Sequence, residues 1–228
     1  MKLDWRPEWE LRKGEILDER AARARLEYCL QGSLSFRTRW RKYVWTPPSK
    51  ELLYPITRFA GKQVLEIGMG KGRMSCLFAA VGARVSGVEL ESCGDALDEA
   101  RRWGVEDRVF FDTTHGDYDR IPNGPFDVVF TKSVLGFSDK SRYDELLFCI
   151  RDRLTPGGTA LFLENHSDPV LYWFRRHVTY RKSRWDVHDF GLTRKLVARI
   201  GGVFDDVVVR RHSRLRRAGE RFRRGRCG

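Results

Sequence analysis

The stretch "VLEIGMGKG", Val64–Gly72, decides the fold that this sequence predicts. A short run of apolar, strand-forming residues leads directly into three glycines within five residues: Gly68, Gly70 and Gly72. A glycine-rich turn between a strand and a helix presents backbone N–H groups at the positive end of the helix, where an anionic or zwitterionic group meets no side chain. Such turns also occur for purely structural reasons, and in nicotinamide and flavin sites.

Outward from this turn, short apolar runs alternate with helical patterns. Strands are expected in "QVLEI", "RVSGVEL", "RVFFD", "FDVVFT" and "TALFLE", and helices in residues 72–81, 94–103 and 139–154. The last helix is expected to end at "TPGG" and to bury residues three and four apart, namely Tyr143, Leu146, Leu147, Ile150 and Leu154. The pattern predicts an α/β fold: a Rossmann-like, doubly wound, mostly parallel sheet of the seven-stranded type, with helices on both faces.

The two ends of the chain follow other patterns. Residues 8–31 are rich in helix formers, and a short helix is expected near residues 49–59, so we predict a helical and extended cap over residues 1–60. The main domain is expected over residues 61–212, with a helix in "FGLTRKLVARIGG" and a strand in "VFDDVVVRR". Almost no apolar residues follow that strand, so the seventh strand is expected to be missing or irregular.

The composition is that of a globular protein with a basic end. The 228 residues are 41% hydrophobic and 32% charged, enough to form one packed core. Of the net charge of +12, the residues from Arg210 onward contribute +8, with nine arginines and one acid, which leaves +4 on the first 209. A mobile, solvated tail over residues 213–228 is expected, and contact with RNA, an anionic membrane surface or an acidic partner is the alternative.

The cysteines and the N-terminus indicate a compartment. The five cysteines are scattered and never spaced as C-x-x-C, which argues against a disulfide framework and against a metal site. The first residues carry acids and no apolar signal segment, and no run approaches the ~20 apolar residues of a membrane span. We therefore expect reduced thiols, no bound metal and a cytoplasmic protein.

Acidic residues follow the predicted strand ends. Glu66 precedes the first glycine, and Glu89 ends the next strand, where a carboxylate can accept the two hydroxyls of a ribose. Asp117 lies in the loop after the third strand and can accept a hydrogen bond from an adenine amino group. The structural alternatives are that Glu66 caps a neighbouring backbone, that Glu89 is a solvated strand end, and that Asp117 belongs to a turn.

Four segments in register resemble the successive motifs of class I S-adenosylmethionine-dependent methyltransferases: "VLEIGMGKGRMS", "VSGVELE", "HGDYDRIPNGPFDVVFTKSVLGF" and "RLTPGGTALFLE". The resemblance runs from about Lys62 to Glu164 and resumes in "LTRKLVARIGGVFDDVVV". It implies S-adenosylmethionine as the cofactor, with S-adenosylhomocysteine as its product, and methyl transfer as the activity.

The resemblance also implies roles for individual residues. The glycine loop would lie under the methionine portion of the cofactor, Glu66 would help to hold its amino end, and Glu89 would bind the ribose. The adenine would meet Asp117 and Tyr118, with Leu90 on its other face. The full expected cofactor set is Glu66, Gly68, Met69, Gly70, Gly72, Glu89, Leu90, Asp117, Tyr118 and Thr131.

Residues after the fourth and fifth strands could face the acceptor. His166 is the candidate general base, although a histidine that caps a loop is an equal alternative. Near His166, at the end of the fifth strand, lie Glu164, Asn165 and Asp168, which could orient a substrate. Lys132 and Ser133 are expected to line the cofactor pocket. Residues 166–188 are predicted to form a substrate lid rich in aromatic and basic residues, which could bind an anionic substrate or an anionic membrane, or be an ordinary amphipathic helix.

Several functions remain open on sequence alone. The first is methyl transfer to an oxygen or nitrogen of a small molecule, such as a saccharide, a lipid-linked compound or a secondary metabolite. An RNA methyltransferase would suit the basic and aromatic segments, but "TKSVLGF" differs from the motif of base-amine methylating enzymes. A binding module without turnover is disfavoured by the intact glycine loop and Glu89, and a nicotinamide-dependent oxidoreductase by the place of Asp117.

Overall fold

The fold is taken from a computed structural model that describes residues 14–30, 49–135, 138–164, 193–212 and 217–223. The chain divides into two compact units. Unit 1 comprises residues 1–130 and 153–161, and unit 2 comprises residues 131–152 and 162–228. Among the described residues, no helix is both long and apolar enough to span a bilayer.

The glycine-rich turn follows β1, the central strand of a five-stranded sheet with the strand order β3-β2-β1-β4-β5. The strands are β1 (Gln63–Ile67), β2 (Arg84–Glu89), β3 (Val109–Thr113), β4 (Phe126–Lys132) and β5 (Leu154–Leu163). β1, β2 and β3 are parallel, and their register pairs Ile67 with Val88 and Glu89 with Thr113. The strand order reverses between β1 and β4, the place where open α/β sheets form a ligand crevice at their carboxyl ends. The predicted Rossmann-like fold is confirmed.

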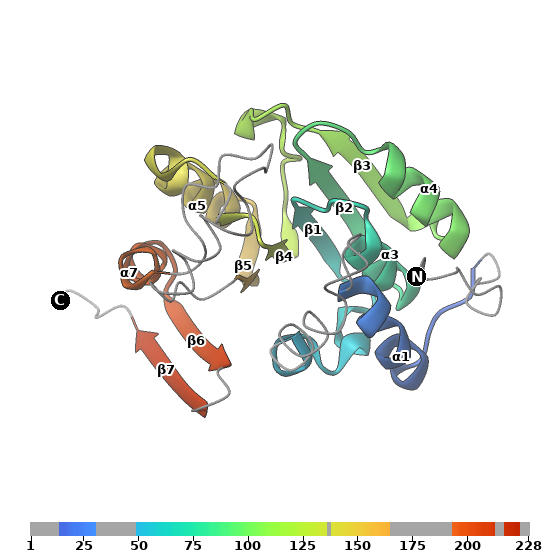
Figure 1. The fold of residues 1–228 in the computed structure, drawn as a ribbon, viewed down its shortest axis with the longest axis horizontal. Coiled ribbons are helices and arrows are strands. Elements are labelled where there is room, and N and C mark those ends of the chain that lie inside the picture. Colours follow the sequence, from blue (N-terminus) through green and yellow to red (C-terminus); the bar gives the residue numbers. More distant parts are fainter. Residues whose placement is uncertain (1–13, 31–48, 136–137, 165–192, 213–216, 224–228) are drawn as a thin grey trace, which may run out of the picture. The chain divides into compact units, whose positions relative to one another are not determined.

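Two helices connect the parallel strands of unit 1, α3 (Arg73–Ala80) and α4 (Gly94–Trp103). Figure 1 shows α4 alongside β3, and α3 beside the N-terminal helix. Every residue of α3 after Arg73 is buried, because the helix packs against strands and against other helices. Phe78 of α3 packs between Phe59 and Phe130, with ring centroids 4.7 and 5.4 Å apart, and so joins this helix to the sheet core. The helix predicted at residues 94–103 has those bounds, and the one at 72–81 is one residue shorter at each end.

The N-terminal helix α1 spans Glu19–Leu30, within the predicted range 8–31. It begins later than predicted because the carboxylate of Asp18 accepts the backbone N–H of Ala21 at 2.7 Å, as an N-cap does. Residues 8–13 and 31 lie outside the described residues. Near the predicted helix at 49–59, residues 49–53 are helical and Ile56–Phe59 form a 3₁₀ turn, η3.

Unit 2 holds two helices, α5 (Tyr143–Asp152) and α7 (Arg194–Val203). α5 buries the predicted face except for Leu154, which instead begins β5. The prediction that "TPGG" ends the helix is wrong, because the chain extends beside β4 as soon as α5 ends: Phe126 N donates to Arg153 O at 2.8 Å. α7 starts at a Thr193 cap, whose hydroxyl accepts Leu196 N at 3.1 Å.

The C-terminal strands form a sheet of their own. β6 (Asp206–His212) pairs with β7 (Arg217–Arg223) in an antiparallel hairpin. The seventh strand, expected to be missing or irregular, is present as β7 in this separate hairpin, because pairing of backbone groups needs no apolar side chains. Within the described residues, however, the main sheet has five strands, so the seven strands do not form the single sheet that the sequence suggested.

Candidate functional site

The glycine loop is a left-handed turn tied to the neighbouring strand. Gly68, Gly70 and Gly72 have φ values of +71°, +57° and +68°, which side chains with a Cβ rarely adopt. The backbone N–H groups of Gly68 and Met69 both donate to Val88 O of β2, at 2.9 and 3.2 Å. The loop is thereby fixed at the carboxyl end of β1 and β2.

The glycines are required for different reasons. A Cβ on Gly72 would lie 2.7 Å from the Cβ of Ala96, so this glycine allows α4 to pack against the start of α3. A Cβ on Gly70 would meet no atom of the described residues within 4 Å. The described part of the chain therefore leaves open space over Gly70, where a bound group could approach its backbone.

The first turn of α3 faces this loop without a side-chain cap. Its N-cap is Gly72, which has no side chain to accept a hydrogen bond from the helix. Within the described ranges, the positive end of the helix dipole therefore has no anionic side chain as its N-cap.

Glu89 joins the loop to the end of β2. One oxygen of its half-buried carboxylate accepts the backbone N–H of Gly70 at 2.5 Å, and the other accepts that of Leu90 at 2.8 Å. Two backbone donors thus orient the carboxylate at the strand end, and each oxygen retains a further lone pair.

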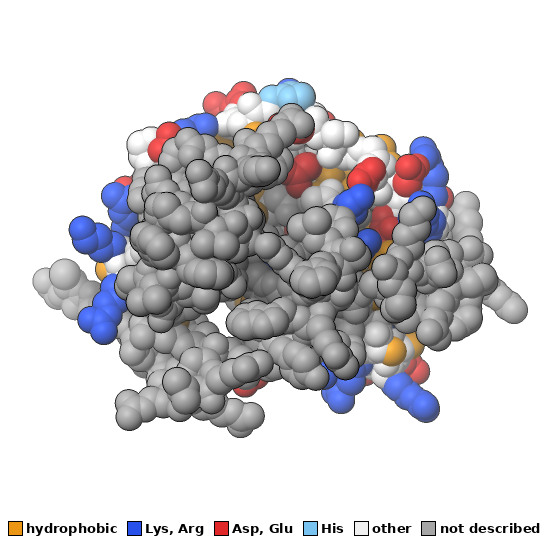
Figure 2. All heavy atoms as spheres, viewed as in Figure 1, with side chains coloured by type: hydrophobic (Ala, Val, Ile, Leu, Met, Phe, Trp, Pro, Cys, Tyr) orange, Lys and Arg blue, Asp and Glu red, His pale blue; other side chains and the backbone are white. Residues whose placement is uncertain are grey.

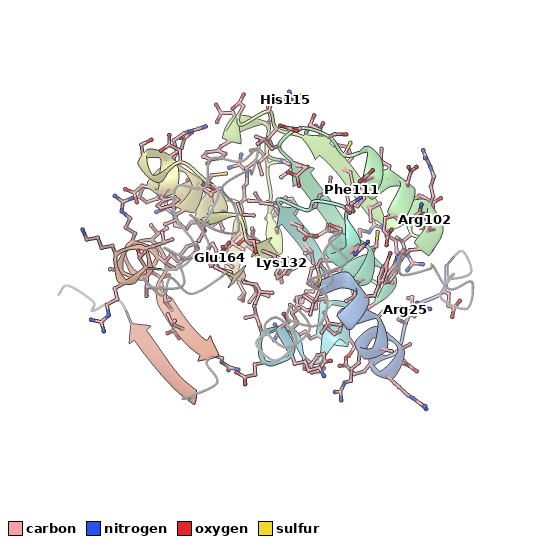
Figure 3. The ribbon with its side chains drawn as sticks, in the orientation of Figure 1. Arg25, Arg102, Phe111, His115, Lys132 and Glu164 are labelled. Carbon is pink, nitrogen blue, oxygen red and sulfur yellow. The ribbon has the colours of Figure 1, made fainter. Side chains whose placement is uncertain are left out.

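The loop after β3 lies beside the same strand end. Thr114 N donates to Glu89 O at 2.8 Å, and His115 N donates to Leu90 O at 3.0 Å. Leu90 has 41% of its surface exposed, a large value for leucine. His115 adopts a positive φ of +51°, and Figure 3 shows it beyond the end of β3. An exposed apolar surface is therefore presented next to the Glu89 carboxylate.

Asp117 is exposed in this loop, and part of its role is structural. Its Oδ1 accepts the backbone N–H of Asp119 at 2.9 Å and caps a short 3₁₀ turn, η5 (Tyr118–Arg120). Asp117 therefore forms part of a turn, which is the structural alternative that the sequence had left open for it. Tyr118 is half-buried, and its carbonyl oxygen accepts the Arg153 guanidinium at 3.2 Å.

Two predicted cofactor residues have buried side chains. Glu66 is 2% exposed, and the Ser75 hydroxyl of α3 donates to its carboxylate at 2.5 Å. Met69 is 5% exposed and packs against Gly87, where a Cβ would lie 2.5 Å from its Sδ. Neither Ser75 nor Gly87 was predicted as part of the site. An isolated glycine inside a strand is a signal of close approach that could have indicated Gly87.

The ends of β4 and β5 bring a second group of predicted residues together in unit 2. Glu164 Oε1 accepts the backbone N–H groups of Val134 and Leu135 at 2.7 and 3.0 Å, so it fixes the turn after β4. Ser133 in that turn has φ +58°, and its N–H donates to Leu163 O at 3.0 Å. Lys132 lies next to this turn at the end of β4, as Figure 3 shows.

Thr131, also on β4, is fully buried, and its hydroxyl has no hydrogen-bond partner among the described residues. Asn165, His166 and Asp168 lie outside the described residues, as does the predicted lid at 166–188. The candidate base therefore stays a prediction.

Acidic and basic side chains alternate along the outer edge of unit 1. Figure 2 shows red and blue side chains mixed over the region where Figure 1 draws α4. The pairs include Lys71 with Asp95 at 2.6 Å and Arg101 with Asp98 at 2.9 Å. The hydrogen bond from Lys71 lowers the pKa of the exposed Asp95 carboxyl. Among the described residues, the side chains of this edge carry both signs of charge, whereas a surface that binds nucleic acid is mainly basic.

Comparisons with known proteins agree with the fold. A family model described as "Methyltransferase domain" matches residues 64–158. The chain is similar to the structure of magnesium protoporphyrin IX methyltransferase from Synechocystis PCC 6803 with bound SAH, at 16% identity over 82% of this chain and 85% of that one, with a TM-score of 0.60. It is also similar to the YcgJ protein from Bacillus subtilis, at 19% identity over 70% of each chain, with a TM-score of 0.56.

A further structure, phosphoethanolamine N-methyltransferase 2 from Haemonchus contortus in complex with S-adenosyl-L-methionine, is 20% identical over 71% of this chain and 38% of that one, with a TM-score of 0.51. At these identities the likeness is one of fold. No curated protein matches the sequence.

Proposed function

We propose that this chain, whose residues 64–158 match a methyltransferase domain, is a class I S-adenosylmethionine-dependent methyltransferase that transfers a methyl group from S-adenosylmethionine to an oxygen or nitrogen of a small molecule. The observation that carries the proposal is the open space over Gly70, directly beside the carboxylate of Glu89. Backbone donors, a carboxylate and the exposed face of Leu90 meet there in unit 1.

The residues of unit 1 fit an adenosyl cofactor. We assign the ribose hydroxyls to Glu89, because a carboxylate held by two backbone donors can still accept two hydroxyl groups. Leu90 offers an apolar surface to the adenine, and Asp117 is left with one oxygen, Oδ2, outside its turn hydrogen bond for the adenine amino group. The uncapped start of α3 suits the anionic or zwitterionic group at the methionine end of the cofactor.

The buried Glu66 acts from below the loop in this proposal. Its carboxylate, held by Ser75, places negative charge under the glycine turn and favours a cationic amino group above it. Met69 contributes through its backbone, since its side chain packs in the core. Gly68 and Gly72 shape the turn, and the expected role of Thr131, which lies in unit 2, stays a prediction.

Bound S-adenosylmethionine supplies a methyl group already activated on a sulfonium. The chain's own task is to orient the acceptor in line with that group and to keep water away. A proton must leave only when the attacking oxygen or nitrogen arrives protonated, and His166 remains our candidate to accept it. Glu164 fixes the turn after β4 rather than acting as a base, because its Oε1 accepts two backbone N–H groups.

A small-molecule acceptor is supported by the names of two similar structures, which are methyltransferases of magnesium protoporphyrin IX and of phosphoethanolamine. The mixed charges along the α4 edge also favour this class over RNA. No observation in the described residues favours the RNA alternative.

Incubation with a methyl-radiolabelled donor and fractionated cell extract tests the proposal. We expect label in the small-molecule or lipid fraction, and much less of it when Glu89→Ala protein replaces the wild type at the same concentration and at a limiting concentration of the donor. Label found in RNA alone would overturn the proposed acceptor class while leaving the methyl-transfer activity in place.

A further inference from the structure

A stacked pair of side chains joins helix α1 to the residue that directly follows the glycine loop. The guanidinium of Arg73 lies over the ring of Tyr28, with its Cζ 4.5 Å from the ring centroid. Arg73 is the first residue of α3 and directly follows Gly72. Tyr28 lies in the last turn of α1, a part of the sequence far from the loop.

Tyr28 is itself anchored by a buried carboxylate. Its hydroxyl donates to Glu99 Oε1 at 2.7 Å, and the indole N–H of Trp103 donates to the same oxygen at 3.1 Å. Glu99 is 4% exposed, and Arg102 lies 3.6 Å from its other oxygen. A buried carboxylate with these partners is satisfied and holds the tyrosine ring in one place.

A second arginine completes the cluster on the α1 side. Arg25 lies over the ring of Trp103 at 5.5 Å and is 8% exposed. Figure 3 shows Arg25 on α1 and Arg102 on α4. The rings of Tyr28 and Trp103 have centroids 6.4 Å apart, so α1 and α4 are joined through aromatic rings stacked with cations.

The stacked pair acts on the turn that shapes the proposed cofactor site. Arg73 belongs to the same helical turn as Ser75, which donates to Glu66. It also follows the left-handed Gly72, whose orientation decides where the first N–H groups of α3 point. A rotation at Arg73 would therefore move both the backbone donors and the buried carboxylate contact.

We propose that Tyr28 is a positioning residue for the cofactor site, and that its ring, by holding Arg73, makes cofactor affinity depend on helix α1. The inference rests on the proposed function, because it concerns the same glycine loop. Tyr28 has no direct contact with the cofactor in this account and acts through Arg73.

If Tyr28 only stabilises the fold, we expect a different result: the affinity for the cofactor should fall only in variants whose free energy of unfolding falls. Two of the contacts that Tyr28 makes separate these cases. Its hydroxyl donates a hydrogen bond to Glu99, while its ring stacks with the guanidinium of Arg73. Tyr28→Phe removes the first contact and keeps the second, whereas Tyr28→Leu removes both.

Calorimetric titration of the full chain with S-adenosylhomocysteine tests the inference, at a temperature where unfolding curves show every variant folded. We expect Tyr28→Phe to bind within about twofold of wild type despite a lower unfolding midpoint. Tyr28→Leu and Arg73→Met should each bind about five- to tenfold more weakly, as expected for loss of a cation–π contact.

Arg23→Met is the matched control. Arg23 of α1 stacks on Tyr54 at 4.5 Å, the same distance as in the pair of Arg73 and Tyr28, but its partner lies outside α3. We expect wild-type affinity from this variant, because it removes an equivalent contact of the same helix without touching the loop.

Each adverse result has a separate meaning. Wild-type affinity in Tyr28→Leu, or in Arg73→Met should Tyr28→Leu not fold, would overturn the inference and leave the proposed function intact. Equal weakening in Tyr28→Phe and Tyr28→Leu would also overturn it, since the ring would then not carry the effect. Absence of binding to the wild-type chain would instead overturn the proposed function, and the inference with it.

Discussion

The backbone N–H of Gly70 donates to the carboxylate of Glu89 at 2.5 Å, across the carboxyl ends of β1 and β2. The glycine with open space above it and the acid assigned to the ribose are therefore parts of one structure. Because Glu89 also accepts Leu90 N, its carboxylate is oriented in the absence of any bound group. A site built in this way needs little rearrangement to bind a nucleoside.

Replacing Glu89 by alanine should weaken binding of S-adenosylhomocysteine roughly 10- to 100-fold, because hydrogen bonds to a charged group contribute about 1.5–3 kcal/mol. Calorimetric titration measures the change. Glu91→Ala is the control, since Glu91 is an exposed acid two residues further along and should leave the affinity unchanged. Equal affinities in wild type and Glu89→Ala would contradict the ribose assignment.

The glycines of the loop should respond differently to alanine. Both Gly70→Ala and Gly72→Ala force a residue with a Cβ into a left-handed conformation, at a cost of about 1–2 kcal/mol. Gly72→Ala also places a Cβ 2.7 Å from that of Ala96, which should add about 1–3 kcal/mol of overpacking. Urea unfolding should therefore rank Gly72→Ala as the less stable variant, while Gly70→Ala should lose cofactor affinity. Equal losses of stability would show that packing on α4 does not distinguish the two glycines.

Tyr28 should make the protein less stable at alkaline pH. Burial, followed by the hydrogen bond to Glu99, raises the pKa of Tyr28 well above its ordinary value. A raised pKa in the folded state means that the contribution to stability is present below the pKa of the unfolded chain, about 10, and is lost as the pH rises toward the folded value. Unfolding free energies measured between pH 8 and 11 should fall more steeply for wild type than for Tyr28→Phe. Parallel slopes would argue that the buried phenol is not the group that titrates.

The sequence predicted the parts of the site that depend on local pattern. The strand before Gly68, the helix after Gly72 and the acid at the end of β2 follow from apolar runs, glycines and strand-end chemistry, and the structure has each of them. The helix at residues 94–103 has the predicted bounds because Gly104 ends it in a left-handed conformation, with φ +60°.

Other features depend on partners that are distant in sequence. Ser75 donates to Glu66 across the loop, and no pattern in the chain pairs a helix hydroxyl with a strand carboxylate. Tyr28 and Glu99 are 71 residues apart, so their hydrogen bond follows from tertiary packing alone. The seventh strand was expected to be missing or irregular because strand prediction relies on apolar side chains, whereas the pairing of β7 with β6 is made by backbone groups.

A crystal structure of the chain with S-adenosylhomocysteine tests the central claim most directly. The account predicts the ligand over Gly70, with its ribose hydroxyls within hydrogen-bond distance of the Glu89 carboxylate and its adenine against Leu90. A ligand bound elsewhere, or a Gly70 surface covered by the protein's own side chains, would contradict it.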